Sequence, residues 1–212
     1  MLNRAKVLFM NRLLIILILT ISYQSWVNAE DIRDFEIEGI SIGDSLLLYS
    51  SKQEINNGMI TDYNSNKYSR YTLREINSKS LEKYDDVQVH FLTNDNKYII
   101  TGVSGGVFEK NKFNQCLEMR DQVINVISDM FPNAKTNDSG TSIWLEADPS
   151  GETKTSQYFF NLQSPSKYSD YIEVACYDWG EEASKKYNAS DHFKLAIIEK
   201  NFGKWLSEEA WK

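Results

Sequence analysis

Cysteine and histidine are scarce in this chain of 212 residues, which contains only two of each. Cys116, Cys176, His90 and His192 form none of the short pairs that are typical of a zinc site. An Asp-x-Asp-x-Asp loop, typical of calcium sites, is also missing. The sequence therefore predicts no metal site and no cofactor. It also contains no internal repeat that would indicate a repeat architecture.

Clusters of positive charge are also absent. The chain has 23 Lys and Arg against 30 Asp and Glu, a net charge of −7, and its lysines are scattered among acidic residues. Favourable contact with phosphates needs clustered Lys and Arg, so we expect no nucleic-acid partner.

The first 29 residues have the features of a secretion signal. Arg4, Lys6 and Arg12 form a basic start, residues 13–21 are an uncharged apolar run, and Val27-Asn28-Ala29 matches a small-x-small cleavage site. The run is well short of the roughly 20 residues that span a bilayer, and no cysteine lies near the cut to carry a lipid. We expect residues 1–29 to be a cleaved signal peptide, with export to the periplasm in a bacterium or secretion otherwise, and no stable membrane anchor after cleavage.

An even number of cysteines in an exported chain favours a disulfide. Cys116 lies on the apolar stripe of a predicted helix, and Cys176 lies on the buried face of a predicted strand over 171–179. We therefore predict a bond between Cys116 and Cys176. The alternative is two buried free thiols that act as small apolar core residues.

Residues 30–212 are long enough for a single globular domain. Alternating apolar residues around Asn94-Asp95-Asn96 predict an antiparallel hairpin over 86–107. A second hairpin is predicted from strands at 143–147 and 158–162, joined by turn residues at 148–151.

Helical spacing is clearest over residues 112–130, which Pro132 ends, and residues 133–140 are predicted to be a polar loop. The pattern over 192–198 fits a strand or a helix, and we favour the strand; residues 200–211 predict a short amphipathic helix. Together these elements predict an α+β fold, with a mainly antiparallel sheet built from hairpins and packed on one long amphipathic helix.

The N-terminal third is less regular. Loose alternation predicts a half-exposed strand over 30–40, and residues 69–76 predict another strand. Asp44 is predicted to cap a short helix over 45–49. Ser51 and Glu54 have the spacing of a capping box for a second helix.

Gly43-Asp44-Ser45-Leu46 resembles the first sequence block of the GDSL family of esterases and lipases. The resemblance covers four residues and implies Ser45 as a nucleophile, with Gly43 allowing a sharp turn and His192 as the base. That family has an Asp three residues before its catalytic His, whereas Asp191 directly precedes His192 here. The other interpretation is that Asp44 or Ser45 caps a helix.

Aromatic residues are abundant, with 12 Tyr and 5 Trp. Aromatic rings suit sugar rings and peptide partners, and they also form cores and cross-strand pairs. His90 and His192 are both expected to be exposed surface histidines, because His90 falls on the polar side of a hairpin strand.

The leading functional hypothesis is therefore an exported soluble protein, a binding or envelope-accessory protein that acts by non-catalytic interaction. Its partner would be another protein, a small molecule or a glycan. The alternative hypothesis is a GDSL-like serine esterase or lipase with Ser45 as nucleophile and His192 as base.

Overall fold

The computed structural model describes residues 31–210 apart from 62–64, 74, 77–78, 109–111 and 163–166. The predicted signal peptide, residues 1–29, lies outside the described residues. None of the helices found in the described part of the chain has the length and apolar character needed to cross a membrane.

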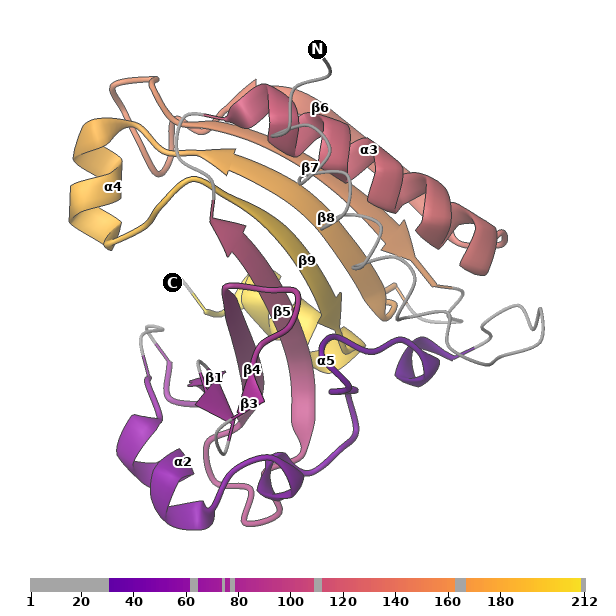
Figure 1. Cartoon of the computed structure of the whole chain (residues 1–212), viewed down its shortest axis with the longest axis vertical. Coiled ribbons are helices and arrows are strands. Elements are labelled where there is room, and N and C mark those ends of the chain that lie inside the picture. The colour runs from indigo at the N-terminus through magenta and orange to yellow at the C-terminus, as the bar shows by residue number, and fades with distance from the viewer. Residues whose placement is uncertain are drawn as a thin grey trace.

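The architecture is mixed α+β around a seven-stranded antiparallel sheet with strand order β1-β4-β5-β9-β8-β7-β6 (Figure 1). The strands are β1 (Tyr68–Leu73), β4 (Asp86–Leu92), β5 (Ile100–Phe108), β6 (Lys135–Ile143), β7 (Lys154–Asn161), β8 (Tyr171–Asp178) and β9 (His192–Ile198), with a separate pair β2 (Glu75–Ile76) and β3 (Lys79–Ser80). The helices are η1 (Ile32–Asp34), η2 (Leu46–Leu48), α2 (Lys52–Gly58), α3 (Phe113–Met130), α4 (Glu181–Tyr187) and α5 (Lys200–Glu208).

The predicted hairpin over 86–107 is confirmed as β4 and β5, and the strand over 171–179 as β8. Residues 192–198, for which a helix was the alternative, form strand β9. The predicted C-terminal helix is confirmed as α5, and Ser51 and Glu54 form the predicted capping box. These elements have clear local patterns because each has one predominantly apolar face.

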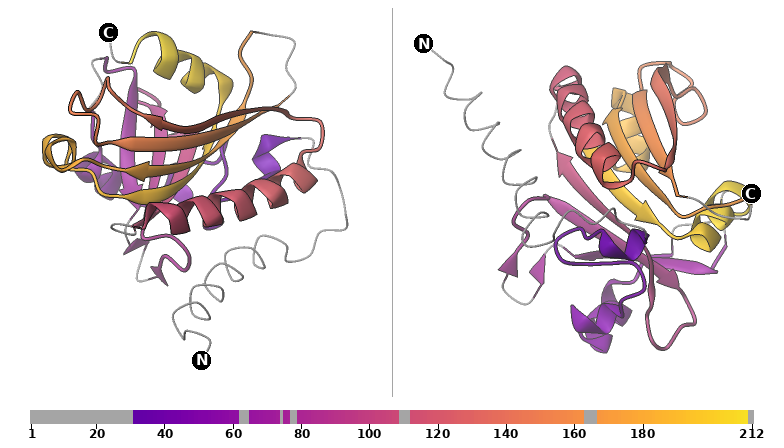
Figure 2. Two further views of the ribbon diagram at one scale, coloured as in Figure 1. Left: turned by 90° about the horizontal axis from the view of Figure 1, so that it is seen from above. Right: turned by 90° about the vertical axis from the view of Figure 1, so that its right-hand side faces the viewer.

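Both faces of the sheet are covered, but by different elements (Figure 2). Helix α3 packs on β8 and β9, and the segment 32–55 continues the same core over β4 and β5. Helix α5 lies on the opposite face, where Phe202 and Trp205 pack with Tyr68, Ala196 and Ile198. Packing on one helix alone therefore does not describe this fold, because α3 covers only part of one face.

Residues 133–140 were predicted to be a polar loop, which is wrong. They contribute most of β6, an edge strand in which every residue except Gly140 is exposed. A strand that buries neither face shows no apolar alternation, so its sequence looks like that of a loop.

The predicted strand over 30–40 is also wrong. It is replaced by η1 and by a tight turn in which Ile37 and Ile40 pair across Glu38 and Gly39, both with positive φ (54° and 74°). The helix after residue 44 is capped by Ser45 instead of Asp44, since the Ser45 hydroxyl accepts from the Leu47 amide.

His90 was expected on a solvent-exposed face, and this prediction is wrong as well. Its ring stacks on Phe202 of α5 with centroids 4.8 Å apart, and the residue is 9% exposed. The alternation of side chains along β4 does place His90 on the face of the sheet opposite the main core. Helix α5, however, covers this face of the sheet around His90. Burial, aided by the positive charges of Arg70 and Lys194, lowers the pKa of His90 to about 3.

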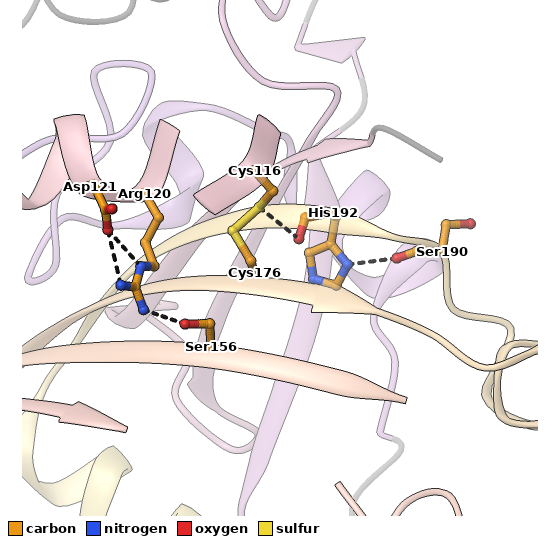
Figure 3. The surroundings of a disulfide bond; sticks show 7 residues. All are labelled: Cys116, Arg120, Asp121, Ser156, Cys176, Ser190 and His192. Atoms are coloured by element: carbon orange, nitrogen blue, oxygen red, sulfur yellow. Dashed lines mark hydrogen bonds and ion pairs between the residues drawn. A yellow bond between two sulfur atoms is a disulfide. The ribbon is translucent and has the colours of Figure 1, made fainter. Parts of the chain in front are cut away.

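Cys116 and Cys176 form a disulfide that joins α3 to β8, with Cα atoms 5.9 Å apart (Figure 3).

One turn further along α3, the guanidinium of Arg120 also reaches the sheet. It donates to Asp138 of β6 at 3.3 Å and to Ser156 of β7, and it binds Asp121 at 3.0 Å. Helix α3 is therefore fixed to three consecutive strands by one covalent bond and one buried cation.

We expect reduction of the disulfide to lower the free energy of unfolding substantially. The bond closes a loop across 60 residues, for which the chain-entropy model gives about 4 kcal/mol. Urea unfolding of the wild type with and without reductant, beside the Cys116→Ala/Cys176→Ala variant, measures the loss. Equal stability of the oxidised and reduced forms would contradict this expectation.

His90 should make the fold sensitive to acid. Because its pKa in the folded state lies below the unfolded value of about 6.5, the unfolded chain binds the extra proton, and stability falls as the pH decreases from 6.5 toward 3. We expect about 3 kcal/mol of loss from this residue between pH 7 and pH 4. Urea unfolding of His90→Phe, which retains a ring against Phe202, should show a correspondingly flatter dependence. Parallel pH curves for variant and wild type would refute the assignment.

Candidate functional site

Ser45 and His192 lie at opposite ends of the sheet. Ser45 bridges to Ile99, immediately before β5 begins, whereas His192 pairs with Phe108 at the end of β5. Nine residues of strand separate these two points, about 30 Å. The Ser45 hydroxyl donates to the carbonyl of Lys97 at 2.6 Å. The structure thus does not bring the nucleophile and base of the esterase hypothesis together.

His192 is held as a neutral ring. Its Nδ1 lies 2.7 Å from the carbonyl oxygen of Ser190, and because a carbonyl only accepts, Nδ1 carries the hydrogen. Burial lowers the pKa of His192, with the hydrogen bond to Ser190 acting in the opposite direction. The carbonyl of His192 also faces the disulfide, 3.8 Å from the Cys116 sulfur (Figure 3).

Around His192 the structure assembles six rings on one face of the sheet, which we call the aromatic cluster. Its members come from the ends of β5, β8 and β9, from α4 and from the β6–β7 connection: Phe108, Trp144, Tyr177, Trp179, Tyr187 and His192. Strand alternation gives the shared face, because Tyr177, His192 and Phe108 are directly opposite one another on β8, β9 and β5.

The rings of the aromatic cluster are in continuous contact. Tyr177 stacks on His192 with centroids 4.8 Å apart and lies nearly parallel to Trp179 at 6.2 Å. Trp144 tilts over Trp179 at 5.7 Å, and Tyr187 of α4 approaches the same indole at 5.9 Å. The assembly is therefore a packed inner stack with outer rings around it.

The three outer rings face solvent. Trp144 is 37% exposed, Tyr187 45% and Phe108 46%, whereas Tyr177 in the middle of the stack is 9% exposed. A group of large rings that stays partly exposed on a protein surface is a candidate for ligand or partner binding.

Only part of this cluster was visible in the sequence. Of its six members, His192 alone was singled out from the sequence, and Phe108, Trp144 and Tyr187 were not connected with it. The six residues extend over 85 positions of the chain, so no local spacing joins them. The one signal is the alternation of side chains along the strands, which directs Phe108, Tyr177 and His192 to the face of the sheet opposite α3.

A network of polar groups centred on the buried Glu173 adjoins the cluster on the same sheet face. Glu173 is 6% exposed, and it accepts from Lys194 at 2.8 Å, Gln157 at 3.0 Å and the Tyr177 hydroxyl at 3.1 Å. Tyr177 belongs to both the aromatic cluster and this network, so the polar contacts fix the orientation of the central ring.

The electrostatics of the network favour an ionised Glu173. Burial alone would raise the pKa of Glu173, but the Lys194 ammonium and the donated hydrogen bonds outweigh it and leave the pKa lowered. Burial and the neighbouring carboxylate raise the pKa of Tyr177, so its hydroxyl stays protonated as a donor. Such an arrangement holds the Tyr177 ring in a fixed orientation.

We expect Lys194→Met to destabilise the fold by about 2–3 kcal/mol at pH 7. That is below the roughly 3–5 kcal/mol for a fully buried pair, because the Lys194 side chain is 29% exposed. The loss arises from leaving Glu173 charged and buried. Urea unfolding should show that the Glu173→Gln/Lys194→Met variant recovers part of it, and additive effects of the two substitutions would argue against this coupling.

The same network predicts that the free energy of unfolding decreases at acidic pH. Since the folded pKa of Glu173 is below its unfolded value near 4.3, its stabilisation is present above that pH and is lost as the pH falls through the folded value. Glu173→Gln should remove this contribution.

Among the described residues, no group of three or more His, Cys, Asp or Glu side chains is placed to hold a metal ion. No family model matches the chain, and neither a curated protein nor a solved structure matches it. The candidate site is therefore defined by its own geometry, a partly exposed aromatic cluster on a buried polar network.

Proposed function

We propose that this chain is an exported, non-catalytic binding protein whose ligand is a neutral glycan bound by the aromatic cluster. The observation that carries the proposal is the set of partly exposed rings Phe108, Trp144 and Tyr187. These rings pack against the inner stack, in which a hydrogen bond to Glu173 orients the Tyr177 ring. The disulfide is consistent with an oxidising compartment, as the proposed signal peptide requires.

The chemistry of the surface suits a sugar. Rigid rings offer apolar area to the C–H face of a sugar ring at low cost in conformational entropy. Polar groups beside them can exchange hydrogen bonds with hydroxyl groups, which a purely apolar surface could not do. The net charge of −7 disfavours strongly anionic ligands, so a neutral glycan is the better partner.

Binding is tested by titrating the purified protein with neutral chito- and cello-oligosaccharides, followed by calorimetry and tryptophan fluorescence. We expect Trp144→Ala to weaken binding at least tenfold, about 1.4 kcal/mol, since it removes the exposed ring that covers the inner stack. Leu48→Ala is the matched control, because Leu48 is 72% exposed and lies on η2, outside the cluster. If the wild type binds neither series, the proposal fails.

A further inference from the structure

We propose, on the basis of the glycan function above, that the ligand is a linear oligosaccharide that extends from the aromatic cluster to a second pair of rings, Phe159 and Tyr171. Between the cluster and this ring pair, the side-chain oxygen of Gln157 accepts a sugar hydroxyl. The second subsite lies about 20 Å along β8 from the first, because Tyr171 and Tyr177 are at opposite ends of this strand.

Strand register places these residues on the face of the sheet that carries the aromatic cluster. Tyr171, Glu173 and Tyr177 alternate with core-facing residues on β8, so their side chains share one face. Phe159 of β7 is directly opposite Glu173, and Gln157 precedes Phe159 by two positions. Gln157 therefore shares this face and lies between the ring pair and the aromatic cluster.

The ring pair offers a second aromatic surface. Phe159 and Tyr171 meet edge to face, with ring centroids 6.0 Å apart and an interplanar angle of 66°. Both residues are half-buried, so part of each stays accessible. Helix α5 holds Tyr171 from one side, since a Cβ on Gly203 would lie 2.6 Å from the Tyr171 ring. A further sugar ring could pack on this surface as it would on the aromatic cluster.

Gln157 supplies the polar contact between the two aromatic surfaces. Its amide lies 3.0 Å from Oε1 of Glu173 and 3.2 Å from the Tyr177 hydroxyl. Because a carboxylate only accepts, the group that faces Glu173 is the NH2 of the amide, which leaves Oε1 on the other side. This oxygen receives no hydrogen bond from the residues that the structure describes, and it is accessible to solvent. Such an oriented acceptor suits the hydroxyl donor of a sugar.

The polar groups of this face favour a neutral chain. Glu173 and Lys194 are bound to each other at 2.8 Å and are neutral as a pair. Asn137 of β6 is exposed and directly opposite Phe159, so it adds an uncharged amide beside the ring pair. Amides and rings recognise uncharged sugars, whereas a sulfated glycan would need a cation that is not already engaged.

Chain length gives the first test. Di- and hexasaccharides of the chito and cello series compare a ligand that reaches one aromatic surface with a ligand that reaches both. The hexasaccharide should bind the wild type at least tenfold more tightly than the disaccharide. Phe159→Leu, which removes the ring but keeps an apolar side chain, should weaken hexasaccharide binding at least fivefold and change disaccharide binding less than twofold.

Tyr158→Leu is the matched control for Phe159→Leu. Tyr158 is the adjacent half-buried ring on β7, and it packs against the main core on the opposite face. The control should leave the binding of both probes unchanged within twofold.

Gln157→Met tests the polar contact. Loss of the Oε1 acceptor should weaken hexasaccharide binding at least threefold and leave disaccharide binding unchanged, because Glu173 still accepts from the Tyr177 hydroxyl. Equal weakening of both probes would instead mean that Gln157 only positions Tyr177, and it would overturn the proposed contact.

The outcomes separate the second subsite from the proposed function. A hexasaccharide that binds no more tightly than the disaccharide, or that is unaffected by Phe159→Leu, would overturn the subsite and leave binding at the aromatic cluster standing. No binding of any probe to the wild type would remove both. A test that needs no variant is the side-chain amide resonance of Gln157 in the wild type, which should shift with the hexasaccharide and stay in place with the disaccharide.

Discussion

The pairing of β5 with β9 is the contact on which the rest of the structure depends. It joins the hairpin of β4 and β5 to the meander from β6 to β9, over the register from Gly102 with Ile198 to Phe108 with His192. Because side chains alternate along both strands, this one register also determines which residues share a face. A shift of one residue would move His192 and Lys194 to the side that α3 covers.

The two faces of the sheet have different roles as a result. On one face, α3 and the segment 32–55 form the larger apolar core, and the disulfide and Arg120 hold α3 to β6, β7 and β8. On the other face, α5 covers only one end. The remaining area keeps polar groups and partly exposed rings. The buried carboxylate of Glu173 lies there and is stabilised by the hydrogen bonds that it accepts from Lys194, Gln157 and Tyr177.

Local patterns predicted those elements that have one predominantly apolar face. The hairpin of β4 and β5, strand β8 and helix α5 all have an apolar period that matches their geometry. Strand β6 was missed because an edge strand with exposed faces has no such period. His90 was misplaced for the converse reason: alternation gave its face correctly, but α5, which covers that face, comes more than 100 residues later in the chain.

The sequence by itself determined the acidic charge, the scarcity of metal-binding residues and the period of most strands, since each is a property of composition or of neighbouring residues. It also made the cysteine pair predictable, because both residues lie on apolar stripes. Only the tertiary structure decided that six distant rings meet around His192 and that Ser45 lies at the opposite end of β5 from it. Those outcomes depend on strand order and register, which are set by long-range pairing and not by the residues next to each ring.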